Sequence, residues 1–101
     1  MNYDEFIPLK ELYHGTSIKV KDQIISDGIK KMNRQYVHLS QDIDTALKVG
    51  KRHGRPFIFK VDALKMLEDG IKFYISDNKV VLVDFVDKKY LEPVFLKDSN
   101  K

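Results

Sequence analysis

The 101-residue sequence contains no cysteine. Disulfide bonds and thiolate chemistry are therefore excluded, and a zinc site would depend on histidine and carboxylate side chains alone. The sequence also has no apolar run as long as a membrane span, and its start, MNYDEF, is too acidic and too short for a signal peptide. We therefore expect a cytoplasmic protein with no membrane partner and no metal site.

A large excess of charge of one sign is missing as well. The 18 Lys and Arg residues exceed the 15 Asp and Glu residues by a net charge of +3, and 43% of the residues are hydrophobic. This composition is typical of a globular chain, and its length suits a single domain over residues 1–101. The mild positive charge is compatible with RNA or another phosphate-bearing partner, and also with a charge that serves solubility alone.

Hydrophobic periodicity predicts a mixed α+β domain rather than a regular βαβ alternation. Neither GxGxxG nor GxxxxGK[ST] is present, which disfavours the common nucleotide-binding folds. About six strands and two or three helices are expected, with the helices early and the strands clustered late. Strands are expected at 11–15, 37–40, 56–63, 71–75, 80–86 and 91–97, and helices at 18–28, from 43 to about 50, and at 64–70.

Local signals refine this pattern. Val20, Ile24 and Ile25 are expected to face the core from the first helix. Asp42 is expected to cap the second helix, on which Gly50 would allow close backbone packing. Pro93 favours an edge position for the last strand, and the tail after it is expected to fray.

Three strings, LYHGTS at 12–17, MNRQYVHLS at 32–40 and VGKRHG at 49–54, place histidines next to predicted strand or helix ends. The imidazole of His14 offers a donor and an acceptor to sugar hydroxyls, and Gly15 would let its backbone approach a flat ring. His38 and Ser40 should share one face of a strand whose other face is buried. Each motif alone also fits a structural histidine or a solvent-exposed face.

Basic residues accompany these histidines. Arg34 lies in a loop before the strand of His38, where an arginine can hold a phosphate bidentately. Arg52 and His53 lie at a predicted helix C-terminus, where the helix dipole favours basic side chains in any case. This inventory is typical of a site for a phosphorylated, sugar-bearing ligand. No Ser/His/Asp triad or pair of catalytic carboxylates stands out, so hydrolases of those types are not expected.

Taken together, the strings resemble the catalytic lobe of the NAD-dependent RNA 2′-phosphotransferases, the family known from tRNA splicing. The resemblance runs from about Leu12 to Tyr90 and includes LYHGTS, VHLS, the Arg52-His53-Gly54 segment and Phe73-Tyr74. It implies an ADP-ribosyltransferase-like fold, in which two small, roughly perpendicular sheets with two or three helices surround an NAD cleft. It also implies transfer of ADP-ribose to an RNA 2′-phosphate with loss of nicotinamide, followed by release of ADP-ribose 1″,2″-cyclic phosphate.

The resemblance also implies roles for individual residues. His14, His38 and an aliphatic residue, Val80, would form the signature triad of the fold, and Arg34 would contact the attacking phosphate. Because a phosphate is already a nucleophile, positioning and charge stabilisation would suffice without a strong base. The residues expected to be catalytic are Arg34, His14 and His38; those expected to bind NAD are His14, Gly15, Thr16, His38, Ser40, Arg52, His53 and Val80.

The sequence departs from the family pattern at two places. Only the residues up to Lys10 precede the first expected strand, so we expect the family's N-terminal RNA-binding lobe, with its catalytic partners of Arg34, to be absent. Lys79 and Val81 stand where the family usually has glycine and tryptophan. Three hypotheses follow: NAD-dependent ADP-ribosyl transfer to a phosphate-bearing acceptor such as RNA; a non-catalytic module that captures NAD, ADP-ribose or a cyclic ADP-ribose-type signalling nucleotide; and a toxin-like transferase, against which the missing glutamate argues.

Overall fold

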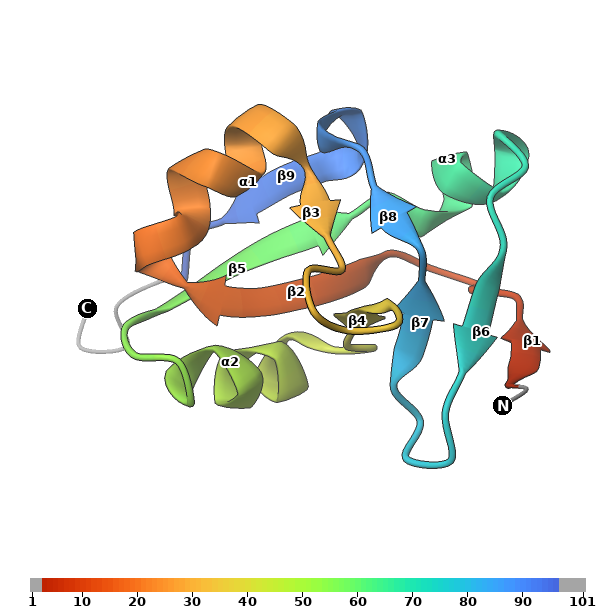
Figure 1. The fold of residues 1–101 in the computed structure, drawn as a ribbon, viewed down its shortest axis with the longest axis horizontal. Helices are drawn as coiled ribbons and strands as arrows, with labels where there is room; N and C mark the ends of the chain where they lie inside the picture. Colours follow the sequence, from red (N-terminus) through yellow and green to blue (C-terminus); the bar gives the residue numbers. More distant parts are fainter. Residues whose placement is uncertain (1–2, 97–101) are drawn as a thin grey trace.

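A computed structural model describes residues 3–96 of the chain (Figure 1). In this range the mixed α+β class is confirmed, because three α-helices accompany several small sheets whose strands all pair antiparallel. The tail that was expected to fray, residues 98–101, lies outside the described residues.

The largest sheet in the described range has four strands in the order β1-β6-β7-β4. Its register places His38 opposite Leu82, and Leu82 opposite Tyr74 on the next strand. Val37 and Leu39 are buried while His38 is exposed, which confirms the predicted alternation along this strand. The strands are β1 (Asp4–Phe6), β4 (Val37–Leu39), β6 (Phe73–Ile75) and β7 (Val81–Val83).

A second sheet has the order β2-β5-β9 and crosses the first. In Figure 1, β2 and β5 lie roughly horizontal, whereas β6 and β7 lie roughly vertical. Its strands are β2 (Leu12–Ser17), β5 (Pro56–Val61) and β9 (Leu91–Val94). Pro93 lies on β9 at an edge of this sheet, as predicted. A two-stranded sheet pairs β3 (Ile29–Lys30) with β8 (Phe85–Val86).

The α-helices are short, and the second and third are capped by the side chains of Asp42 and Asp62, whereas the first has no side-chain cap. Asp42 caps the helix after β4, because its carboxylate oxygen accepts a hydrogen bond of 2.7 Å from the backbone N–H of Thr45. This confirms the predicted cap. The helices are α1 (Lys21–Asp27), α2 (Ile43–Lys51) and α3 (Ala63–Glu68), with short 3₁₀ turns η1 (Ile18–Val20) and η2 (Lys88–Tyr90).

Two glycines bring α2 against β2. A Cβ atom on Gly15 would lie 1.8 Å from the carbonyl oxygen of Ala46 in α2, a distance that no side chain tolerates. A Cβ atom on Gly50 would lie 3.0 Å from the carbonyl oxygen of Thr16, so the predicted close packing of this glycine is confirmed. The missing side chains therefore set the distance between α2 and the strand that carries His14.

One cluster of buried side chains joins all three sheets. Residues on β2, β3, β5, β6, β7 and β8 contribute to it, including Leu12, Ile29, Phe59, Phe73 and Val86. Each of these side chains is withdrawn from water, which is the main favourable contribution to folding. The sheets are thus held in one arrangement, and the side chains on their outer faces have defined positions.

Several expectations about the elements were wrong. Ile25 is 48% exposed, whereas Ile24 is 8% exposed, because successive helix positions point about 100° apart and only a narrow face of α1 meets the core. The strand expected at 80–86 is interrupted at Asp84 and forms β7 and β8. The two short strands β1 and β3 were not expected.

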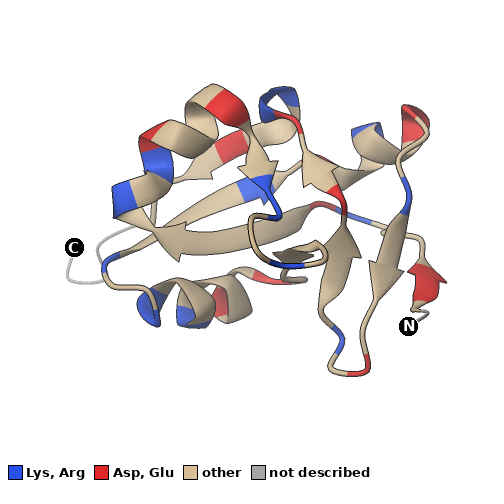
Figure 2. Ribbon diagram, in the orientation of Figure 1, with Lys and Arg blue, Asp and Glu red and all other residues tan. Residues whose placement is uncertain are grey.

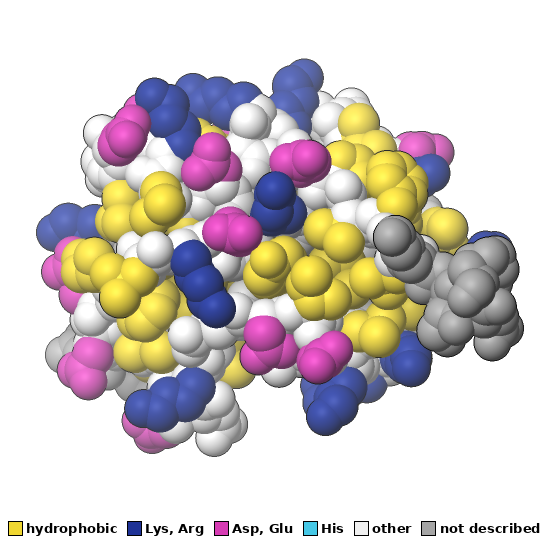
Figure 3. Space-filling model, turned by 180° about the vertical axis from the view of Figure 1, so that it is seen from behind, with side chains coloured by type: hydrophobic (Ala, Val, Ile, Leu, Met, Phe, Trp, Pro, Cys, Tyr) yellow, Lys and Arg dark blue, Asp and Glu magenta, His cyan; other side chains and the backbone are white. Residues whose placement is uncertain are grey.

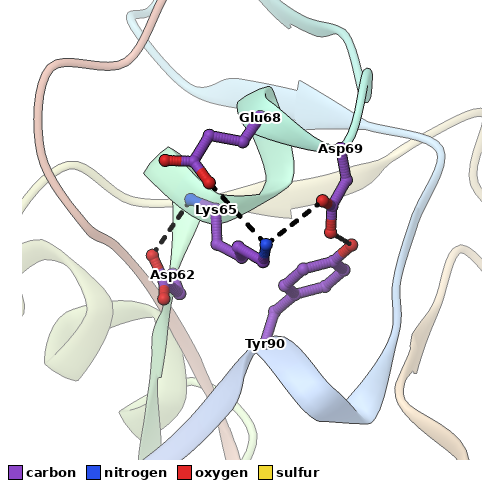
Figure 4. A network of polar contacts seen from close by, with 5 residues as sticks. All are labelled: Asp62, Lys65, Glu68, Asp69 and Tyr90. Atoms are coloured by element: carbon purple, nitrogen blue, oxygen red, sulfur yellow. Dashed lines mark hydrogen bonds and ion pairs between the residues drawn. The ribbon is translucent and has the colours of Figure 1, made fainter.

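A polar network fastens η2 to α3 (Figure 4). The hydroxyl of Tyr90 donates a hydrogen bond of 2.5 Å to the carboxylate of Asp69, which raises the pKa of Tyr90 to about 12. Lys65 lies 3.5 Å from Asp69 and 3.7 Å from Glu68, and its backbone N–H donates to the Asp62 side chain. These contacts anchor the chain where it enters β9.

Candidate nucleotide site

The structure joins the three residues expected to be catalytic by two side-chain hydrogen bonds. His14 on β2 uses Nδ1 to contact the backbone carbonyl oxygen of His38 on β4 at 3.0 Å. Arg34, in the loop before β4, uses Nη1 to contact Nδ1 of His38 at 2.9 Å. These three residues are therefore connected by hydrogen bonds, and His14, Arg34 and His38 together are called the histidine group.

The partners of the two histidines determine which ring nitrogen carries the proton. A carbonyl oxygen only accepts, so Nδ1 of His14 carries the hydrogen and its Nε2 is left as an acceptor. A guanidinium group only donates, so Nδ1 of His38 accepts and its Nε2 carries the hydrogen. The neutral pair therefore presents one acceptor and one donor, which is the combination that a sugar hydroxyl can use.

The surroundings favour the neutral form of both rings. Burial lowers the pKa of His14 below its ordinary value of 6.5, opposed by its hydrogen bond to His38 and supported by the charges of His38 and His53. Burial also lowers the pKa of His38, and the positive charge of Arg34 lowers it further. Both imidazoles are therefore uncharged at neutral pH, as the hydrogen bonds require.

The loop that carries Arg34 is tied at its base. The backbone N–H of Arg34 donates to the carbonyl oxygen of Lys31 at 2.9 Å, and Met32 between them has a left-handed φ of 54°. The ammonium group of Lys31 contacts the carboxylate of Asp84 at 2.7 Å, which ties the loop to the junction of β7 and β8. Lys and Arg residues occupy this loop in the middle of Figure 2, so basic residues lie next to His38.

Ser40 joins the two larger sheets beside this group. Its backbone N–H donates to the carbonyl oxygen of Tyr13 at 2.7 Å, and the N–H of Tyr13 donates to the carbonyl oxygen of Ser40 at 2.9 Å. Ser40 follows β4 and Tyr13 precedes His14 on β2. This bridge brings His14 within reach of the His38 carbonyl.

Val80 precedes β7 directly, and the pairing of Leu39 with Val81 places it beside Ser40. Because side chains alternate along a strand, Val80 belongs to the sheet face that carries His38. It is half-buried. The aliphatic member of the expected triad therefore lies next to the histidines.

The remaining expected residues have less direct links to this group. Gly15 and Thr16 follow His14 along β2, and the open side of Gly15 is filled by the backbone of α2. Arg52 and His53 are exposed at the end of α2, and the charge of His53 affects the pKa of His14. The ligand contacts expected of these four residues stay predictions.

The prediction missed two tyrosines on the same sheet face. Tyr36 lies two positions before His38, and Tyr74 is opposite Leu82, which itself is opposite His38. Strand alternation from His38 would have indicated Tyr36. Tyr74 could not be predicted in this way, because its position next to His38 depends on the pairing of β6 with β7 and of β7 with β4.

The rear of the molecule has a different character. Basic and acidic side chains alternate there with hydrophobic ones, and none of the three histidines is visible among the coloured residues (Figure 3). The half-buried Phe57 and the exposed Phe95 form an edge-on aromatic pair with ring centres 6.2 Å apart. The histidine group does not open onto this face.

Among residues 3–96, no three histidine or acidic side chains lie close enough together to hold a metal ion. No helix in the same range has both the length and the apolar character that crossing a membrane would require.

Comparison with known proteins agrees with the resemblance noted in the sequence. The model of the RNA 2′-phosphotransferase, Tpt1 / KptA family, matches residues 2–85. A "Probable RNA 2′-phosphotransferase" of Flavobacterium johnsoniae is 51% identical over 92 residues, which are 91% of this chain and 50% of that protein. One of Trichormus variabilis is 53% identical over 85 residues, 84% of this chain and 47% of that protein. The chain thus spans about half the length of the curated relatives it matches. This chain belongs to the RNA 2′-phosphotransferase family.

Proposed function

We propose that this chain carries out NAD-dependent transfer of ADP-ribose to the 2′-phosphate of an RNA. The observation that supports this most strongly is the hydrogen-bonded group of His14, His38 and Arg34, found in a chain of this family. The same family membership favours RNA as the acceptor over a protein. The absence of cysteine is in keeping with a cytoplasmic location, which is part of the proposal.

The proposal includes the fold. Residues 1–101 would form one domain of the ADP-ribosyltransferase type, with the nucleotide cleft where the two larger sheets meet. Its support is the crossing of the β2-β5-β9 sheet with the β1-β6-β7-β4 sheet, and the bridge between Tyr13 and Ser40 at their junction (Figure 1). The shared hydrophobic core across all three sheets supports a single domain.

The histidines are suited to hold NAD, which supplies the ADP-ribosyl group and gives up nicotinamide. Nε2 of His14 would accept a hydrogen bond from a ribose hydroxyl, and Nε2–H of His38 would donate one. The half-buried Val80 offers an apolar contact beside them, and the hydroxyl groups of Thr16 and Ser40 offer further polar contacts. The neutral state of both imidazoles favours such hydrogen bonds over ion pairing.

Arg34 is suited to hold the acceptor phosphate. Its guanidinium group has five N–H donors, of which Nη1 contributes one to His38. The planar fork of the group matches two phosphate oxygens. Because the phosphate is already an anion, orienting it and balancing its charge lowers the barrier without a general base. Arg34 thereby couples the position of the acceptor to the position of His38.

Mass spectrometry of the purified chain mixed with NAD and a short RNA tests this proposal. The RNA is supplied in two forms, with a 2′-phosphate or with a 2′-hydroxyl at one internal nucleotide. We expect nicotinamide, dephosphorylated RNA and ADP-ribose cyclic phosphate only with the 2′-phosphorylated RNA.

Two results would count against the proposal. Nicotinamide release that does not depend on the 2′-phosphate would show a different acceptor. Unchanged NAD and RNA would instead support the capture of NAD or an ADP-ribose-type nucleotide without turnover.

A further inference from the structure

A shallow groove of about 320 Å³ lies beside the four-stranded sheet, where β7 passes into β8. Its walls are largely aromatic and aliphatic, with one lysine and one aspartate. The lining residues are Tyr36, Ile71, Lys72, Tyr74, Val83, Asp84 and Phe85. His14, Arg34 and His38 are not among these lining residues, so the groove is a feature separate from their hydrogen bonds.

Two tyrosines of the groove share a sheet face with His38. Tyr36 lies two positions before His38, which is on β4, so strand alternation assigns their side chains to one face of the sheet. Tyr74 lies on the same face, since its partner Leu82 is also the partner of His38. β6 and β7 run side by side (Figure 1), and Arg34 precedes β4 in the sequence. A ligand held at Arg34 and His38 can therefore reach the tyrosines along this face.

The groove tyrosines meet their aromatic neighbours at an angle. The ring centres of Tyr36 and Tyr74 are 5.9 Å apart with planes tilted by 44°, and those of Tyr3 and Tyr36 are 6.0 Å apart at 79°. Neither pair is stacked in parallel, and both groove tyrosines are half-buried. Part of each ring is therefore open to a further flat ring, which would stack with an offset.

The charges around the groove are mixed, with positive charge on the side of the histidines. Lys72 lines the groove, and the carboxylate of Asp84 is paired with Lys31 at 2.7 Å. Glu5 on β1 is the direct partner of Tyr74, so an acid lies beside this tyrosine. Arg34, next to His38, adds the positive charge that an anionic chain requires. Aromatic faces beside basic side chains are the combination that binds single-stranded nucleic acid.

We propose that this groove, the tyrosine groove, binds the base of a nucleotide adjacent to the 2′-phosphorylated one. The proposal deepens the proposed function and rests on it, because Arg34 must first hold the phosphate. Tyr36 follows Arg34 by two residues, so a strand that leaves Arg34 passes Tyr36 and Tyr74 first. Since every base has a flat face, the groove accepts any of the four bases.

The test compares RNA trinucleotides whose central nucleotide carries the 2′-phosphate. One has bases throughout, and two others have an abasic sugar on the 5′ or the 3′ side. Fluorescence anisotropy of labelled oligonucleotides gives Kd, and nicotinamide release with NAD gives kcat/KM. We expect the loss of one flanking base, and not the other, to weaken binding by between about 5-fold and about 150-fold.

Substitutions in the groove test whether the tyrosines cause the tighter binding of the base-bearing oligonucleotide. Tyr74→Leu should bind the abasic and base-bearing oligonucleotides alike, whereas Tyr74→Phe, which keeps the ring, should retain the preference. Tyr36→Leu gives a second probe if Tyr74→Leu does not fold. Phe95→Leu is the matched control, since Phe95 is exposed after β9 in the other sheet and should leave the preference unchanged.

The outcomes separate the two proposals. Equal Kd values for base-bearing and abasic oligonucleotides with the parent chain would overturn the tyrosine groove, even if nicotinamide is released. A full preference in Tyr74→Leu and Tyr36→Leu would overturn it as well. A base preference lost in those variants, without any nicotinamide release, would support the groove while contradicting the proposed transfer reaction.

Discussion

His14 and His38 are the same residue type with opposite hydrogen-bonding roles. The carbonyl oxygen that His14 contacts makes its outer nitrogen an acceptor, whereas the guanidinium that His38 contacts makes its outer nitrogen a donor. The difference comes entirely from the partners. A substitution that keeps one nitrogen and removes the other therefore separates structural from ligand-binding contributions.

His14→Asn is such a substitution. The asparagine amide can donate to the His38 carbonyl as Nδ1 does, but it does not reach the position of Nε2. We expect the free energy of unfolding to change by less than about 1 kcal/mol, and NAD affinity to fall by about 5-fold to about 150-fold, the cost of one lost buried hydrogen bond. Urea unfolding and calorimetric titration with NAD measure the two effects. His14→Gln, whose longer side chain reaches the Nε2 position, is the control and should bind NAD more tightly than His14→Asn does. Parent-like affinity in His14→Asn would contradict the assigned acceptor.

The lowered pKa of His14 predicts a dependence of stability on pH. In the unfolded chain the ring takes up a proton below its ordinary pKa of 6.5, while the folded chain resists protonation to a lower pH. Stability is therefore complete above about pH 6.5 and is lost as the pH falls through the lowered pKa. His38, whose pKa is also lowered, acts in the same direction.

We expect the urea midpoint to decrease between about pH 7 and about pH 5, and to decrease less in His14→Asn. An identical pH dependence in the variant would show that His14 is not responsible.

Part of this residue-scale description was predictable and part was not. The positions of His14 and His38 on strands follow from hydrophobic alternation and from the family resemblance, although β2 continues to Ser17 and leaves His14 inside the strand and not at its end. Their tautomers do not, because the carbonyl that orients His14 is 24 residues further along the chain. A sequence pattern of strands does not specify which carbonyl a side chain will meet.

Among the elements, the contact of α2 with β2 depends on glycine. The expected reason for Gly15 was close approach of a ligand ring, whereas the neighbour that the structure shows is the backbone of α2. Gly15→Ala should destabilise the chain by about 3 kcal/mol or more, because a Cβ atom would overlap the Ala46 carbonyl and α2 would have to move.

Gly50→Ala provides a graded comparison. Its Cβ atom would meet neighbours at 3.0 Å, and alanine favours a helix over glycine by about 1 kcal/mol, so the two effects partly cancel. We expect a change within about 1 kcal/mol, measured by thermal or urea unfolding. Equal stabilities of the two variants would show that the 1.8 Å contact at Gly15 is not decisive.

Elements with a clear local signal were predictable, and those without one were not. The Asp42 cap, the apolar face of α2 and the apolar-polar alternation in β4 are such signals. The strands β1 and β3 contain three and two residues without a comparable alternation, and they form because β6 and β8 offer backbone partners. The break at Asp84 likewise follows from β8 pairing with β3 in a different sheet from β7.

At the scale of the whole molecule, the candidate site is made where separate segments meet. β2 contributes His14, β4 contributes His38, and the loop between β3 and β4 contributes Arg34 (Figures 1 and 2). A shared core and the bridge between Tyr13 and Ser40 hold these segments together. The proposed reaction needs this arrangement, because the acceptor phosphate and the nucleotide must be held side by side.

The most direct test is a cycle that combines removal of Arg34 with removal of the RNA 2′-phosphate. Nicotinamide release is measured for the parent chain and Arg34→Ala, each with 2′-phosphorylated and with 2′-hydroxyl RNA, and Lys88→Ala serves as the control for loss of an exposed basic residue. We expect Arg34→Ala to lower kcat/KM by about 10-fold to about 150-fold with the phosphorylated RNA. The hydroxyl RNA should release no nicotinamide with either chain, so the comparison between the two RNAs uses Kd from fluorescence anisotropy. Arg34→Ala should weaken binding of the phosphorylated RNA and change binding of the hydroxyl RNA little, because the phosphate that Arg34 contacts is already missing there. Equal weakening of both RNAs by Arg34→Ala, or no effect of the substitution on Kd and kcat/KM, would contradict the assigned role of Arg34.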